Sequence, residues 1–65
     1  ASSRVFRRSL FVVRDVNTGE AFTEENIRSI RPGHGLSPKY IAQILGRHAV
    51  KDIRIGTPLS WDLVG

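Results

Sequence analysis

The chain has 65 residues, a formal net charge of +4 and no cysteine. This length allows one domain with a small core, and the lack of cysteine excludes disulfide stabilisation. Hydrophobic residues make up 40% of the chain, so general disorder is not expected. No apolar run approaches the roughly 20 residues of a membrane-spanning helix, and no signal peptide is recognisable. We therefore expect a small cytoplasmic domain, and the absence of an initial Met indicates a fragment or a processed chain.

The first eight residues, ASSRVFRR, show no periodicity and are interpreted as a tail or interdomain linker, so that residues 9–65 form the domain. A basic segment of this kind attracts nucleic acid, an acidic protein face or an anionic small molecule. Charge alone does not choose among these three partners. The arginines of the first fourteen residues are Arg4, Arg7, Arg8 and Arg14.

Two segments of the chain repeat one pattern at a constant offset, which is 52 − 15 = 37 residues for their aspartates. The segments are VRDVNTGEAFTEENI (13–27) and VKDIRIGTPLSWDLV (50–64), and they share V-[RK]-D-[VI]-x-x-G-x-x-[FL]-[ST]-x-[ED]-x-[IV] without a gap. A unit this short cannot bury its own apolar face, so we expect the two copies to pack together with pseudo-two-fold symmetry. The alternative is a chance similarity of two strand–turn segments.

The order of residues in each unit predicts a short strand, a turn, a second extended piece and a capped helical turn. In the first unit, residues 10–13 open the strand. Asp15 and Gly19 bracket the turn, because Asp can bond nearby backbone N–H groups and Gly can adopt φ > 0. Thr23 then caps the helical turn. In the second unit these roles fall to Asp52, Gly56 and Ser60.

A long loop and one short helix are expected between the two units. The stretch IRPGHGLSPKY (30–40) contains two prolines and two glycines, which is typical of a loop. Ser37 suits a helix N-cap, Pro38 the first helical position and Gly46 the position after a helix end. We expect a helix of about two turns here, packed on the strands through the apolar residues Ile41, Ile44 and Leu45.

Catalytic and metal-binding chemistry has little support in the residues alone. No Ser, His and Asp are arranged locally as nucleophile, base and orienting group. His34 and His48 are separated by too many residues to form a metal site without further ligands, and no complete phosphate-binding glycine motif is present. We therefore expect no catalytic residue, no metal ligand and no bound cofactor in this domain.

Arg31 is the charge of greatest interest in the loop. Pro32 restricts Arg31 to extended conformations, so the guanidinium starts from a stiff backbone. Gly33 and Gly35 let the chain turn sharply afterwards. A planar group with five donors suits a carboxylate, a phosphate or an amide carbonyl. The alternative is an ordinary ion pair with a surface Asp or Glu, and the residues alone favour that alternative.

The stretch from Arg8 to Val64 resembles the C-terminal antifreeze-like (SAF) domain of the sialic acid synthase family, which includes N-acetylneuraminate and pseudaminic acid synthases. The resemblance lies in R-S-L before the strand, R-P-G-x-G, L-G-[RK] and D-I-x-x-G-T-P-L-x-W-D-L. The motif R-P-G-x-G-L-x-P-K-Y most resembles the corresponding motif in synthases of pseudaminic and related nonulosonic acids. The resemblance implies a compact β-clip fold, shared with type III antifreeze proteins. That fold is mainly β with short helical turns and has an internal pseudo-two-fold repeat.

The resemblance also implies a function for the loop. In such synthases a TIM barrel condenses phosphoenolpyruvate with an N-acetylated amino sugar, using a divalent metal, manganese or magnesium. The SAF domain of one subunit covers the barrel of the other in a domain-swapped homodimer, and the arginine of the R-P-G motif reaches the sugar. That arginine is Arg31 here; Pro32, Gly33 and Gly35 would set its geometry, and His34 would line the same mouth. The chain alone would be catalytically inert.

Two other functions stay open. The fold is shared with antifreeze proteins, which suggests ice binding, but an ice-binding face is flat and weakly charged. Here 25% of residues are charged and the loop carries Arg31, His34 and Lys39, which argues against it. A small basic nucleic-acid-binding domain is the second alternative. It is disfavoured because the aromatic residues do not alternate with the basic ones as a base-stacking surface requires.

Overall fold

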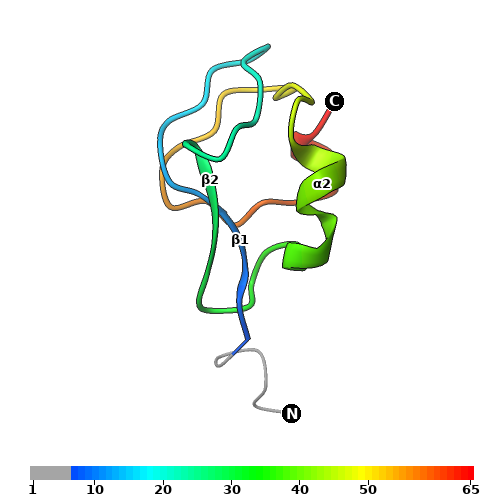
Figure 1. Ribbon diagram of the computed structural model, residues 1–65. Coiled ribbons are helices and arrows are strands. Elements are labelled where there is room, and N and C mark those ends of the chain that lie inside the picture. Colours follow the sequence, from blue (N-terminus) through cyan, green and yellow to red (C-terminus); the bar gives the residue numbers. More distant parts are fainter. Residues whose placement is uncertain (1–6) are drawn as a thin grey trace.

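Residues 7–65, which the computed structural model describes, contain two strands and three short helical segments. The strands pair antiparallel, with Ser9 opposite Ile30 and Val12 opposite Ile27. Figure 1 shows this pair on one side of the molecule and the coil of the helical segments on the other. The elements are β1 (Ser9–Val12), β2 (Ile27–Ile30), the 3-10 helix η1 (Pro38–Tyr40), the helix α2 (Ile41–Ile44) and the 3-10 helix η2 (Trp61–Leu63).

The predicted pseudo-two-fold symmetry is confirmed at its axis by one reciprocal pair of hydrogen bonds. Val16 and Ile53 are equivalent at the offset of 37 (53 − 16 = 37). The N–H of Val16 donates to the carbonyl oxygen of Ile53 at 2.8 Å, and the N–H of Ile53 donates to that of Val16 at 2.7 Å. Equivalent residues that bond each other in both directions lie on the two-fold axis.

The symmetry continues away from the axis, because each unit closes the turn of the other. The N–H of Gly19 donates to Ala49 O at 2.8 Å, and the N–H of Gly56 donates to Val12 O at 2.7 Å. Both acceptors are again 37 residues apart (49 − 12 = 37). Both glycines adopt the predicted positive φ, 86° for Gly19 and 92° for Gly56.

The two aspartates of the repeat also act across the axis. Asp52 Oδ1 accepts from the N–H of Thr18 at 2.8 Å, and Asp15 Oδ1 accepts from the N–H of Ile55 at 2.8 Å. The prediction that each aspartate bonds groups of its own turn is therefore wrong, since the backbone N–H groups that bond these carboxylates belong to the opposing turn. Thr18 adds a bond from its hydroxyl to Asp52 Oδ1 at 2.9 Å. The bonds from the Thr18 N–H and hydroxyl lower the pKa of Asp52.

The core lies between the two units; each unit supplies three of its ten residues, and the other four come from the segments that flank the units. Phe22 and its equivalent Leu59 are fully buried, as are Leu10 and Ile44. Because a single unit offers only a few of these side chains, neither has a core of its own. The buried cluster comprises Leu10, Val12, Val16, Phe22, Ile27, Ile44, Ala49, Ile53, Leu59 and Leu63.

The predicted helix is present but irregular. Ser37 is its N-cap, with its Oγ accepting from the N–H of Lys39 at 3.4 Å, and Pro38 is the first helical residue. A 3-10 turn then passes into a single α turn, and Gly46 follows with a φ of 88°. Ile44 is the residue of α2 that is buried in the core.

The two predicted caps of the repeat differ from each other. Thr23 Oγ1 accepts from the N–H of Glu25 at 3.2 Å, as expected of a capping residue. Ser60 stands at the N-cap position of η2 but makes no capping bond to a backbone N–H. Its hydroxyl donates instead to the carboxylate of Asp62 and thereby lowers the pKa of that group. The cap predicted at Ser60 is therefore correct in position and wrong in its bonding.

The turn glycines of the repeat give a direct test of the symmetry. Gly19→Ala and Gly56→Ala should each lower the free energy of unfolding by about 1 kcal/mol, because an L-residue is strained at positive φ. A Cβ at either position would meet no atom within 4 Å, so steric clashes add nothing to the cost. Urea unfolding followed by circular dichroism measures both effects, with the exposed Glu24→Ala as control. A neutral effect at one glycine alone would contradict equivalent turns.

The bonds to Asp52 predict a pH-dependent stability. The folded-state pKa lies below the ordinary aspartate value of about 3.9, so this contribution is fully present above that value and is lost as the pH falls through the folded pKa. Asp52→Asn should therefore be less stable than the parent chain at pH 7. The difference should shrink as the pH is lowered towards 2. Urea midpoints at a series of pH values measure this; a difference that is unchanged at low pH would show that the charge of Asp52 contributes nothing.

Candidate functional site

The R-P-G loop, defined here as residues 31–36, connects β2 to the segment before η1. In Figure 1 it forms the green bend at the lower end of the molecule, beside the start of β1. Arg31 directly follows the last residue of β2, Ile30. The peptide bond between Arg31 and Pro32 is cis.

The five predicted site residues all lie on this loop and fall into two groups by their exposure to solvent. Arg31 and His34 are exposed, whereas Pro32, Gly33 and Gly35 are half-buried. The two side chains that can bind a polar ligand thus face solvent. The residues expected to set the geometry lie against the body of the domain.

A buried serine that the sequence analysis did not identify holds the middle of the loop. The Ser9 side chain donates from its Oγ to the carbonyl oxygen of Pro32 at 2.7 Å, and its Oγ accepts from the N–H of Gly35 at 3.0 Å. Ser9 is only 1% exposed and lies in β1, whose four residues are all buried. The sequence feature that could have identified Ser9 is a single hydroxyl side chain at the start of an otherwise apolar strand.

The end of the loop is fixed by a ring of three backbone hydrogen bonds. The N–H of Leu10 donates to Leu36 O at 2.8 Å, that of Leu36 to Leu59 O at 2.9 Å, and that of Leu59 to Leu10 O at 2.9 Å. Gly35 lies against this ring, and a Cβ on it would be 2.3 Å from Leu10 O. Only glycine fits there, although its φ is not positive. The predicted geometric role of Gly35 is thus explained by close approach.

This ring is also where the two-fold symmetry breaks. Phe22 and Leu59 are equivalent (59 − 22 = 37). The carbonyl of Phe22 accepts from the N–H of Gly46 at 3.0 Å, whereas that of Leu59 accepts from Leu36. One unit is therefore hydrogen-bonded to the end of the helical segment, and the other is hydrogen-bonded to the loop. The loop and the helical segment both lie between the two units and are not duplicated by the repeat.

Arg31 lies in a part of the sequence that has basic residues but no acidic ones. No Asp or Glu occurs in residues 1–14 or 26–51, which include β1, β2, the R-P-G loop and α2. Ser9 and Ile30 form the last pair at this end of the two strands. Arg8 precedes Ser9 and Arg31 follows Ile30, so both arginines lie at the same end of the sheet. Arg8 Nη1 donates to the carbonyl oxygen of Ser29 at 3.2 Å. These segments offer no carboxylate for the ordinary ion pair that the residues alone had favoured.

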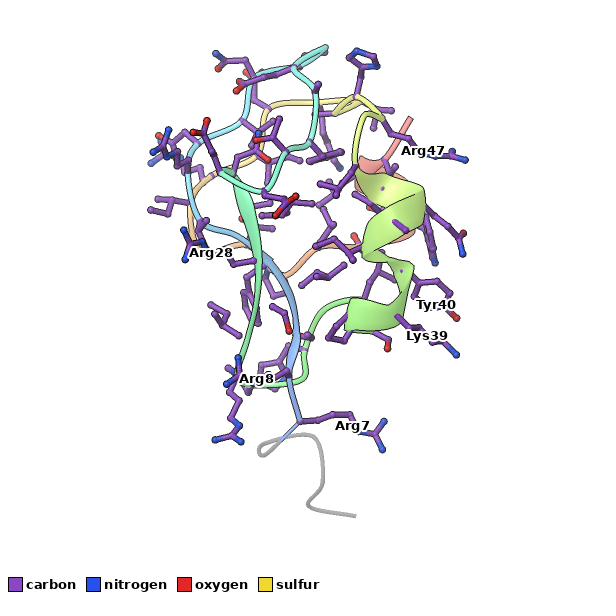
Figure 2. All side chains as sticks on the ribbon, viewed as in Figure 1. Arg7, Arg8, Arg28, Lys39, Tyr40 and Arg47 are labelled. Atoms are coloured by element: carbon purple, nitrogen blue, oxygen red, sulfur yellow. The ribbon has the colours of Figure 1, made fainter. Side chains whose placement is uncertain are left out.

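Further cationic and aromatic side chains lie near the loop. Figure 2 shows Arg7 and Arg8 at the lower end of the molecule and Lys39 and Tyr40 on the neighbouring helical segment. Lys39 Nζ lies 5.1 Å from the centre of the Tyr40 ring, and that ring meets the ring of Trp61 edge-on at 5.4 Å. Trp61 remains 43% exposed. The sequence analysis did not anticipate this aromatic pair.

Other kinds of site were sought over the described part of the chain. Within residues 7–65, no three His, Cys, Asp or Glu side chains come together as a metal site would require. No helix in the same range is long and apolar enough to cross a membrane. A groove of about 430 Å³ includes none of the predicted site residues; it is lined by Glu24, Glu25, Ile27, Arg28, Ser29 and Ile41.

Comparison with known sequences identifies close relatives. The pseudaminic acid synthase of Helicobacter pylori is 52% identical over 59 residues, which cover 91% of this chain and 17% of that protein. The pseudaminic acid synthase of Campylobacter jejuni is 49% identical over 58 residues, which cover 89% of this chain and again 17% of that protein. The chain therefore matches only a small part of these longer enzymes.

Solved structures confirm the predicted fold. The spore coat polysaccharide biosynthesis protein SpsE of Bacillus subtilis superposes with a TM-score of 0.84 and 37% identity, covering 95% of this chain and 19% of that one. The antifreeze protein-like domain of human N-acetylneuraminic acid phosphate synthase superposes with a TM-score of 0.83. It is 17% identical, covers 100% of this chain and 82% of that one, and so shows the fold alone. The family model described as the SAF domain matches residues 7–65, and the chain accordingly belongs to the SAF domain family.

Proposed function

We propose that the chain is the C-terminal substrate-capping domain of a nonulosonic acid synthase, an enzyme that condenses phosphoenolpyruvate with an N-acetylated amino sugar. The identity to two pseudaminic acid synthases supports this class of parent enzyme. The observation that carries the role of the domain is the exposed Arg31 on a loop fixed by Ser9 and by the ring at Leu36. An arginine held in this way is preorganised for a ligand that lies outside the domain.

Arg31 would bind and orient the sugar without making or breaking a bond. Its guanidinium can donate two parallel hydrogen bonds to an amide carbonyl or to neighbouring hydroxyl oxygens. The close-packed Gly35 and the ring at Leu36 keep the end of this short stretch in place. His34, exposed on the same loop, would line the mouth of the same site.

The remaining parts of the site would belong to the barrel of the other subunit in a homodimer. This assignment follows the family resemblance, and it agrees with a domain that presents an exposed cation on its loop. The phosphoenolpyruvate site and the manganese or magnesium ion would then lie on the barrel. The basic end around Arg8 and Arg31 would face the barrel mouth.

Substitution of Arg31 in the full-length synthase tests this function. Arg31→Ala should raise the KM of the amino sugar by about tenfold or more, because hydrogen bonds from a charged donor are lost. The KM of phosphoenolpyruvate should stay within about twofold. Arg31→Lys should give an intermediate value, because it keeps the charge but loses the planar pair of donors. Steady-state kinetics with each substrate varied in turn measures these values.

Arg47→Ala is the matched control for Arg31→Ala. Arg47 is an exposed arginine whose Nε donates to the carbonyl oxygen of Gln43 at 2.8 Å, and Figure 2 places it at the opposite end of the molecule from Arg8. Its substitution should leave both KM values unchanged. A sugar KM that is equally insensitive to Arg31→Ala would remove Arg31 from the site.

A further inference from the structure

The Ser9 hydroxyl is the only side-chain group among the described residues that hydrogen-bonds the interior of the R-P-G loop. It contacts the loop on both sides of its turn, at Pro32 and at Gly35. We propose that Ser9 is a positioning residue for sugar recognition: it holds the loop in the conformation that presents Arg31. This inference rests on the proposed function, since it assigns Arg31 the role described above.

The position of Arg31 in the chain makes its orientation depend on Ser9. On one side Arg31 follows Ile30, which is fixed by its pairing with Ser9 in the sheet. On the other side it precedes Pro32, whose carbonyl oxygen accepts from Ser9 Oγ at 2.7 Å. The same serine therefore fixes the residue before Arg31 through its backbone and the residue after it through its side chain.

The two bonds require a hydroxyl. Pro32 offers only a carbonyl, so its partner must be a donor, whereas the N–H of Gly35 needs an acceptor. A hydroxyl supplies both functions from one atom, and serine is the smallest side chain that carries one. At 1% exposure the Ser9 side chain is enclosed by the surrounding residues. An alanine would fit the same space but would leave both backbone groups without their partner.

The loop ends do not depend on these bonds, so loss of the hydroxyl should loosen the loop selectively. The start of the loop is held by the Ser9–Ile30 strand pair, and its end by the ring that joins Leu10, Leu36 and Leu59. Neither involves the Ser9 side chain. Ser9→Ala should therefore mobilise the stretch between Arg31 and Gly35 while β1, β2 and the core stay in place.

The experiment uses the full-length synthase and two readouts. In Ser9→Ala, hydrogen–deuterium exchange measured by mass spectrometry should increase in peptides that cover residues 31–36 and not in those that cover β1. The KM of the amino sugar should rise by about fivefold to tenfold, less than in Arg31→Ala, with kcat and the KM of phosphoenolpyruvate within about twofold. Ser29→Ala is the matched control, since it removes a hydroxyl from the neighbouring strand; exchange and both KM values should stay at parent levels.

The outcomes separate this inference from the proposed function. In one outcome, the loop exchanges faster in Ser9→Ala but the sugar KM is unchanged, while Arg31→Ala still raises that KM. This outcome overturns the positioning role and leaves the proposed function intact. Unchanged exchange in Ser9→Ala also overturns it. If neither Ser9→Ala nor Arg31→Ala moves the sugar KM, the proposed function fails and the inference with it. Should Ser9→Ala not fold, Ser9→Cys keeps a weaker donor and acceptor, and its sugar KM should lie between those of the parent and Arg31→Ala.

Discussion

The reciprocal pairing of Val16 with Ile53 is the constraint on which the rest of the molecule depends. It places the two units on a common axis, so that each closes the turn of the other and both contribute equally to the core. A 65-residue chain without disulfides has few other means of holding short strands together. The position of β1 follows from this pairing, because Val12 accepts from Gly56 of the opposite unit. The R-P-G loop in turn is fixed on β1.

The loop shows how a symmetric scaffold acquires an asymmetric feature. The carbonyl groups of Phe22 and Leu59 are equivalent but accept from different segments. That of Phe22 accepts from the N–H of Gly46, after the helical segment, and that of Leu59 accepts from the N–H of Leu36, at the end of the loop. The loop thus bonds a carbonyl group that is not paired within the repeat, and it is held there without a core of its own. Ser9 and the ring at Leu36 order its backbone, while Arg31 and His34 are left exposed. Ordering the loop before a ligand binds reduces the entropy lost on binding, which is the advantage of a preorganised contact.

Much of this arrangement was predictable from the sequence, and the limits of the prediction have physical causes. The offset of 37 residues predicted the symmetry, and the turn glycines and the Ser37 cap followed from local residue preferences. The aspartate bonds were assigned to the wrong turn, because local rules do not include a partner 34 or 40 residues away. Ser9 was missed for the same reason: its partners lie 23 and 26 residues along the chain. The need for Gly35 became clear only once the approach of Leu10 was known.

The central claim is that a rigid loop presents Arg31 to a sugar bound by another subunit. The most direct measurement is a crystal structure of the full-length synthase with an N-acetylated amino sugar, or an unreactive analogue, bound in the barrel. We expect the Arg31 guanidinium within hydrogen-bonding distance of the sugar in the opposite subunit, about 2.7–3.2 Å, with both Ser9 bonds to the loop intact. An Arg31 directed away from every sugar, or a loop that has left Ser9 while the sugar is bound, would contradict the account.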